Sequence, residues 1–170
     1  LVKDLRPGPE DSLDFMLSNA NSAQILISRF TNVGGTLYFV ANDGIHGNEL
    51  WKSDGTEAGT VLVKDIDQTS MSDSNYGPDE FIDFGGTLYF YADDGMHGRE
   101  LWKSDGTESG TVMVKDINPG LPSSVSNSST SSGLRVFNNK LIFTASNGTF
   151  VNGEELWISD GTSEGTVMLK

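Results

Sequence analysis

Five carboxylate residues lie in the loops before two of the three tryptophans, and their oxygens could bind a hard cation. The candidate metal ligands are Asp43, Glu49, Asp93, Asp94 and Glu100. Calcium prefers several oxygen ligands within one short loop. No copy of the loop matches an EF-hand, and a third copy carries Ser146 and Asn147 in place of acids. Because Asp and Asn also form ordinary turns, the sequence leaves two alternatives, a calcium site or unliganded turns.

The tips of the same loops hold a second candidate set. The predicted ligand-binding residues are His46, Asn48, His97, Arg99 and Asn152. His46 and His97 stand at equivalent positions, where Asn152 replaces them in the third copy. A catalytic histidine is not usually duplicated in this way, and no nucleophile–base set, Walker loop or zinc spacing occurs. We therefore predict no catalytic residues and no enzyme activity, because similar repeated loops suit weak multivalent binding better.

Three copies of one repeat position these loops. The tryptophans Trp51, Trp102 and Trp157 are spaced 51 and then 55 residues apart. The first two copies are nearly identical over 33 residues, from the Gly-Gly pair to the Lys-Asp-Ile that closes each copy. Such self-similarity is typical of repeat architectures. The aligned segments are Gly34–Ile66, Gly85–Ile117 and Asn138–Lys170.

The second copy predicts a four-stranded antiparallel meander. Its expected strands are Phe81–Phe84, Thr87–Ala92, Glu100–Lys103 and Thr111–Ile117, separated by Gly- and Asp-rich turns. Both faces of its middle strands are apolar, whereas a sheet with one solvated face would alternate apolar and polar residues. A sheet covered on both sides must stack between neighbours. We predict an all-β fold of β-propeller-type blades, with a β-solenoid or a sandwich of meanders as alternatives.

Two features that recur in all three copies of the repeat have structural explanations. The tryptophans resemble a sugar-stacking set, but their mid-strand positions favour core packing. The aspartates before Gly in each Ser-Asp-Gly-Thr turn, at Asp54, Asp105 and Asp160, are expected to accept hydrogen bonds from their own backbone.

The Ser-rich segment Ser123–Ser132 is expected to be loose.

The segments ELWKSDGTEAGTVLVKDI and ELWKSDGTESGTVMVKDI resemble the ELWxxDGT repeat family. The resemblance covers nearly the whole chain, and the third copy departs from it with Ile158 in place of Lys and Asn147 in place of Asp. It implies a large secreted protein and a propeller. It implies no particular reaction.

Composition limits the partners. The formal net charge is −13, which opposes binding to a nucleic-acid phosphate backbone. No apolar run is long enough to span a membrane, and the chain has no cysteine. We expect an extracellular, lectin-like or adhesive binding module whose partners are glycans or a cell surface. A structural unit of an extracellular fibre or matrix is the alternative, and a glycan hydrolase propeller is the third.

The repeat phase divides residues 1–170, a single repeat domain, into an orphan outer strand and three repeats. These are residues 1–5, 6–66, 67–117 and 118–170. We interpret the chain as a processed or excised piece of a longer repeat protein.

Three blades are too few to close a propeller ring, so we predict that the chain assembles with other blades of the same or an identical chain. Deleting Leu1–Leu5 should loosen this assembly more than it harms the blades. Light scattering on the native and truncated chains measures this, and a well-folded monomer of the native chain at micromolar concentration contradicts it.

Overall fold

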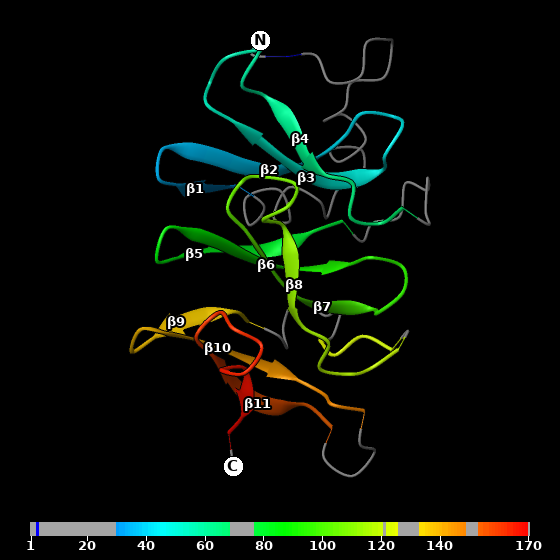
Figure 1. Cartoon of the computed structure of the whole chain (residues 1–170), viewed down its shortest axis with the longest axis vertical. Coiled ribbons are helices and arrows are strands. Elements are labelled where there is room, and N and C mark those ends of the chain that lie inside the picture. Colours follow the sequence, from blue (N-terminus) through cyan, green and yellow to red (C-terminus); the bar gives the residue numbers. More distant parts are fainter. Residues whose placement is uncertain are drawn as a thin grey trace, which may run out of the picture.

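The protein is a stack of three four-stranded antiparallel sheets, as shown by a computed structural model in Figure 1. The structure describes residues 3, 30–68, 77–120, 122–125, 133–148 and 153–169. Each sheet is a meander in which consecutive strands pair. The predicted all-β fold of meander blades is confirmed. In the described part of the chain, no helix has the length and apolarity needed to cross a membrane.

Each sheet, called a blade below, corresponds to one sequence repeat. Blade 1 contains β1 (Thr31–Val33), β2 (Thr36–Asn42), β3 (Asn48–Ser53) and β4 (Val61–Lys64). Blade 2 contains β5 (Asp79–Phe84), β6 (Thr87–Asp93), β7 (Arg99–Ser104) and β8 (Val112–Lys115). Blade 3 contains β9 (Arg135–Phe137), β10 (Lys140–Ala145), β11 (Glu155–Ser159) and β12 (Val167–Met168).

The first hairpin of each blade turns through two residues with positive φ. Gly34 and Gly35 do this in blade 1, with φ of 59° and 92°. Blade 3 makes the same turn with Asn138 and Asn139, at φ of 47° and 57°. Glycine adopts this conformation freely, and asparagine tolerates it better than most residues. This turn therefore requires two residues that tolerate positive φ, and both the Gly-Gly pair of the repeat and Asn-Asn meet that requirement.

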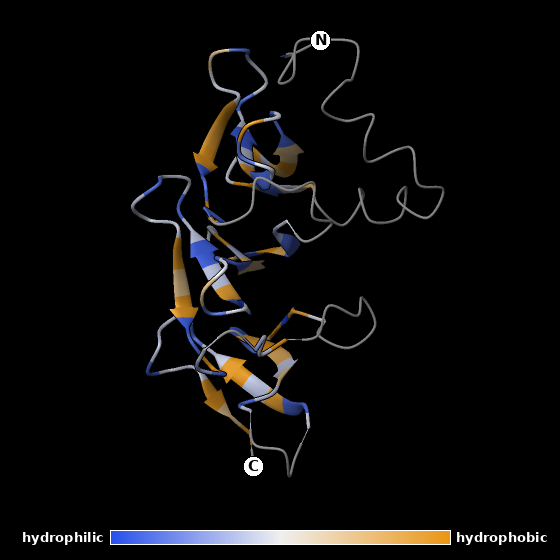
Figure 2. Cartoon of the chain, turned by 90° about the vertical axis from the view of Figure 1, so that its right-hand side faces the viewer, coloured by the Kyte–Doolittle hydropathy of each residue, from blue (hydrophilic) through white to orange (hydrophobic). Residues whose placement is uncertain are grey.

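Both faces of the middle blade are buried, as the sequence predicts. Leu88, Phe90 and Trp102 pack into one core cluster with blade 1. Tyr91 and Leu101, on the opposite face, pack into a second cluster with blade 3. Apolar strand segments recur in all three blades (Figure 2). The hydrophobic core thus lies between the blades, and each blade needs its neighbours to bury its faces.

Lysine side chains connect successive blades across the stack. In each case the ammonium group donates a hydrogen bond to a threonine carbonyl of the next blade's turn. The pairs are Lys3 with Thr60 (2.8 Å), Lys64 with Thr111 (2.9 Å) and Lys115 with Thr166 (2.8 Å). Lys3 therefore occupies on blade 1 the place that Lys64 occupies on blade 2. This part of the predicted orphan strand contacts its own chain, and the rest of Leu1–Leu5 lies outside the described residues.

The Ser-rich linker between blades 2 and 3 begins in a fixed conformation, which corrects the expectation that it is loose from Ser123 onward. The backbone N–H of Ser124 donates to the Arg99 carbonyl (3.1 Å), and its hydroxyl donates to Glu100 (2.6 Å). Val125 is buried in the core between blades 2 and 3. The sequence could not show this because the hydrogen-bond partners of Ser124 lie 22 and more positions away. Residues 126–132 lie outside the described part.

Shortening a side chain that is buried between two blades should lower the stability of the protein. Leu101 is fully buried between blades 2 and 3, so Leu101→Ala should lower the free energy of unfolding by about 2–5 kcal/mol. Urea unfolding measures this loss. Met96→Ala, at an exposed position of the same blade, is the matched control and should change stability by less than about 0.5 kcal/mol. Equal effects of the two substitutions would contradict a core located between the blades.

Candidate ligand-binding loops

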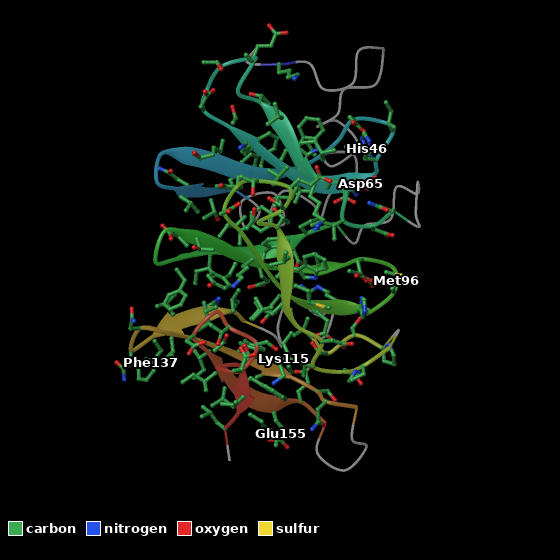
Figure 3. All side chains as sticks on the ribbon, viewed as in Figure 1. His46, Asp65, Met96, Lys115, Phe137 and Glu155 are labelled. Atoms are coloured by element: carbon green, nitrogen blue, oxygen red, sulfur yellow. The ribbon has the colours of Figure 1, made fainter. Side chains whose placement is uncertain are left out.

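The predicted sites lie in two equivalent hairpin loops. The first loop, residues 42–48, joins β2 to β3, and the second, residues 93–99, joins β6 to β7. His46 and Met96, one from each loop, lie along the same edge of the stack (Figure 3). The stacking of the blades therefore repeats one loop along one edge of the protein.

An aspartate organises each loop from within. The Asp43 carboxylate accepts hydrogen bonds from the backbone N–H groups of Ile45 and His46, both at 2.9 Å. Its second oxygen lies 2.7 Å from His46 Nδ1. Asp94 repeats this arrangement in the second loop, with backbone distances of 2.9 Å and 2.9 Å and an imidazole distance of 2.8 Å to His97. The loop shape is therefore fixed by its own sequence, and both copies adopt it.

The Asp–His pairs shift both members toward their charged forms. Burial alone would raise the pKa of Asp43, but the hydrogen bonds from His46 and Ile45 bring that pKa below its ordinary value. The hydrogen bond to Asp43 raises the pKa of His46. In the second loop the pKa of Asp94 is lowered and that of His97 is raised in the same way. Each tip is thus a small polar centre that protonation of one imidazole can turn into an ion pair.

Glu49 and Glu100 have a different role from the one the sequence suggests. Glu49 is almost fully buried, and its carboxylate accepts the backbone N–H groups of Ile66 (3.0 Å) and Asp67 (3.1 Å), just beyond β4. Glu100 makes the equivalent contacts with the residues just beyond β8, at 3.2 Å and 3.3 Å. The glutamate of the Glu-Leu-Trp motif therefore ties the end of the fourth strand to the third strand.

The five predicted metal ligands do not form a cluster. Asp43 and Asp94 are engaged within their loops, while the two glutamates bind backbone beyond β4 and β8. Asp93 accepts the backbone N–H of Gly95 at 2.8 Å. Among the described residues, no group of three or more His, Cys, Asp or Glu side chains is placed to hold a metal ion.

The remaining predicted ligand-binding residues differ in position. Arg99 is buried, where its guanidinium pairs with Asp79 and lies 4.7 Å from the centre of the Tyr91 ring. Asn48 begins β3, at the base of the first loop. Asn152 lies outside the described residues. Of the predicted set, the structure places His46 and His97 at the loop tips.

Sequence reasoning missed one feature of these tips. Ile45 and Met96 precede the two histidines and are 67% and 60% exposed. Together with Phe137, which is 60% exposed, they are the most exposed large apolar side chains in the described part of the chain. The sequence does contain a sign of this exposure. Each apolar residue lies inside a Gly-X-His-Gly turn, where it is not needed for packing of the core. Each tip therefore presents an apolar side chain beside a polar Asp–His pair.

The tryptophans and the Ser-Asp-Gly-Thr turns behave as predicted. Trp51, Trp102 and Trp157 are buried. Asp105 accepts the backbone N–H and the hydroxyl of Thr107, at 2.8 Å and 2.7 Å, and the other two copies do the same. These residues stabilise the blade and do not form part of the loop tips.

Comparison with known proteins gives a distant structural likeness. No protein-family model matches the chain, and no curated protein matches it. Among solved structures, it is similar to a novel alpha-L-arabinofuranosidase from Clostridium thermocellum, with a TM-score of 0.38 and 16% sequence identity. The match covers 83% of this chain and 49% of that chain, so this chain spans about half the length of the structure it matches.

Because the pKa of the buried glutamates is raised, we expect the stability of the protein to depend on pH. Burial raises the pKa of Glu100 to about 7, against the opposing hydrogen bonds from Ser124, Ile117 and Asn118. In the unfolded chain the carboxyl has a pKa near 4.5, so between these values the folded state binds more protons. The free energy of unfolding should therefore fall as the pH rises from about 4.5 to about 7.

Glu100→Gln should make this decline shallower by about 1–3 kcal/mol over that pH range. Denaturant titrations of both proteins at several pH values measure it. Glu57→Gln, at an exposed position, is the control and should keep the decline of the wild type. An unchanged decline in Glu100→Gln would show that Glu100 keeps an ordinary pKa.

Proposed function

We propose that the protein is a non-enzymatic extracellular binding module, lectin-like or adhesive, which uses its repeated hairpin loops for weak multivalent contacts. The observation that carries this proposal is the repetition of one preorganised loop on two successive blades. The Asp–His distances, 2.7 Å and 2.8 Å, agree between the copies, and both tips expose an apolar side chain.

The chemistry of the tip suits a ligand with both polar and apolar parts. The imidazoles of His46 and His97 are 34% and 37% exposed, so each can exchange hydrogen bonds with a ligand hydroxyl. Ile45 and Met96 offer apolar contact beside them. A sugar ring combines hydroxyls with an apolar C–H face, and this supports glycans as the ligand class. Because the aspartate already fixes the loop, binding has little loop ordering to overcome.

Repetition supports avidity over a single strong site. Each tip is small and open, and one contact of this size is weak. Two tips on one rigid stack bind a ligand with repeated units at a high effective concentration, which raises the total affinity without any new contact. A cell-surface glycan is a partner of this type.

The roles of the motif residues support membership of the ELWxxDGT repeat family as part of the same proposal. The glutamate binds the end of the fourth strand, the leucine and tryptophan fill opposite faces of the blade, and Asp-Gly-Thr closes a hydrogen-bonded turn. Every motif position thus has a structural use, which leaves the repeated loop tips as the binding elements.

Replacing the histidines of both loop tips should strongly weaken ligand binding. On a glycan array, with and without calcium, we expect the wild type to bind repeated glycans. His46→Ala should weaken this binding about tenfold, and His46→Ala with His97→Ala about a hundredfold or more, because avidity falls with each lost contact. Glu57→Gln is the control, since Glu57 lies in an exposed turn outside the two loops. Binding that survives in the double variant contradicts the loop assignment, and failure of the wild type to bind any glycan or cell surface contradicts the proposed function.

A further inference from the structure

Both loop histidines are held through the same ring nitrogen. Nδ1 of His46 lies 2.7 Å from Asp43 Oδ2, and Nδ1 of His97 lies 2.8 Å from Asp94 Oδ2. The other oxygen of each aspartate accepts two backbone N–H groups of the loop, so both carboxylate oxygens are engaged. Nδ1 is therefore occupied within the loop in both copies, and the second ring nitrogen, Nε2, is the one left to meet a ligand.

The charge of the aspartate decides which ring nitrogen carries the proton. Burial opposes ionisation, but hydrogen bonds from the loop bring the pKa of Asp43 and of Asp94 below its ordinary value. Both carboxylates are ionised at neutral pH, and an ionised carboxylate can only accept hydrogen bonds. Nδ1 must then donate, and a neutral imidazole has only one N–H. Nε2 of the neutral ring is therefore a hydrogen-bond acceptor.

This acceptor is accessible at both tips. The imidazoles of His46 and His97 are 34% and 37% exposed. Within the described ranges of the chain, no group forms a hydrogen bond with Nε2 of either ring. The exposed side chains of Ile45 and Met96 precede the two histidines. Each tip thus offers a ligand one acceptor atom next to an apolar side chain.

The charges around each imidazole decide which ligand groups can approach it. Among the described residues, the charged groups that act most strongly on the two rings are carboxyl groups, and they come from the loop, the third strand and the end of the fourth strand. They are Asp43, Glu49 and Asp65 around His46, and Asp94, Glu100 and Asp116 around His97. An anionic ligand group such as a sulfate is repelled there. A hydroxyl carries no charge and donates a hydrogen bond, so it fits the acceptor.

We propose that Asp43 and Asp94 are positioning residues, which keep the ring proton on Nδ1 so that Nε2 of each histidine accepts a hydrogen bond from a free hydroxyl of a neutral glycan. The glycan rests on the proposed function, whereas the position of the proton does not. An ether oxygen can only accept, so an O-methylated sugar leaves Nε2 without a partner. The tips therefore select free hydroxyls over methylated ones.

Acid removes this selectivity. The hydrogen bond to the aspartate raises the pKa of His46 and of His97. When the pH falls through this raised pKa, the ring takes up a proton on Nε2, and both nitrogens become donors. A donor at Nε2 can bind an ether oxygen as well as a hydroxyl oxygen. The preference for free hydroxyls should therefore be present above the pKa of the histidines and disappear below it.

Nitrogen NMR of the full chain tests the position of the proton. The chain has only two histidines, so the imidazole signals report the two tips directly. Above the pKa of the histidines, the chemical shifts should show Nδ1–H in both rings. Asp43→Asn with Asp94→Asn should move the proton to Nε2. The backbone N–H groups keep the amide oxygen in place, and the amide N–H₂ then donates to Nδ1.

Two features make this variant informative. The third copy of the repeat has Asn147 where the others have Asp, so asparagine suits this position of the loop. Glu57→Gln with Glu108→Gln is the matched control, because it also removes one charge from each of the two blades, in exposed turns outside the loops. The control should keep Nδ1–H in both rings.

A glycan array tests the selectivity. The array carries each neutral oligosaccharide in two forms, one with free hydroxyls and one O-methylated. The wild type should bind the free form about tenfold or more tightly, because methylation removes a hydrogen bond at both tips. The double asparagine variant should lose most of this preference, since its Nε2–H donates to either form. A purely steric effect of the methyl groups would persist in the variant.

The inference is overturned by Nε2–H in the neutral rings of the wild type, by a proton that stays on Nδ1 in the asparagine variant, or by an equal preference for free hydroxyls in both proteins. Wild-type binding of free and methylated forms alike overturns it too, but leaves the proposed function intact. Failure of the wild type to bind any glycan contradicts the proposed function and the choice of ligand, while the NMR result still decides the position of the proton.

Discussion

The constraint on which the structure depends is that each four-stranded sheet has two apolar faces. Water on either face destabilises a sheet of this kind, since burying one large apolar side chain contributes about 1.5–3 kcal/mol. The middle blade solves this by placing Trp102 toward blade 1 and Leu101 toward blade 3. The stack is the result, and the positions of the loops and of the inter-blade lysines follow from where each blade sits in it.

Polar groups then fix the blades in register. Apolar packing has little directional preference, so it does not by itself set how one blade lies on the next. Lysine ammonium groups supply that direction by reaching the turn carbonyls of the following blade, as Lys64 does at 2.9 Å. Within a blade, buried Glu49 fixes the end of the fourth strand through two backbone N–H groups. Neither of these two sets of contacts involves the tips of the Asp–His loops.

Local features were predictable from the sequence, and long-range contacts were not. Strand alternation revealed the two apolar faces, and turn chemistry identified the Gly-Gly hairpins and the Asp105 cap, because these depend on neighbouring residues. The partners of Glu100 lie 17 and more residues away, so the sequence alone indicates a metal ligand at this glutamate next to a loop. For the same reason the sequence alone indicates that Arg99 belongs to a loop tip, whereas its side chain is buried and pairs with Asp79. At the loops, sequence identified the histidines but missed the exposed Ile45 and Met96, because an apolar residue is ordinarily assigned to the core.

Each blade carries one tryptophan, and this allows the central claim, that the blades are stable through one another, to be tested directly. Three variants that each keep one of Trp51, Trp102 or Trp157, with phenylalanine at the other two positions, report on the blades separately through fluorescence during urea unfolding. Mutual stabilisation predicts one cooperative transition, with the same midpoint in each variant's tryptophan signal as in its backbone circular dichroism. If each tryptophan signal instead changed at its own midpoint, apart from the backbone transition of the same variant, the blades would be independent units and the account would be wrong.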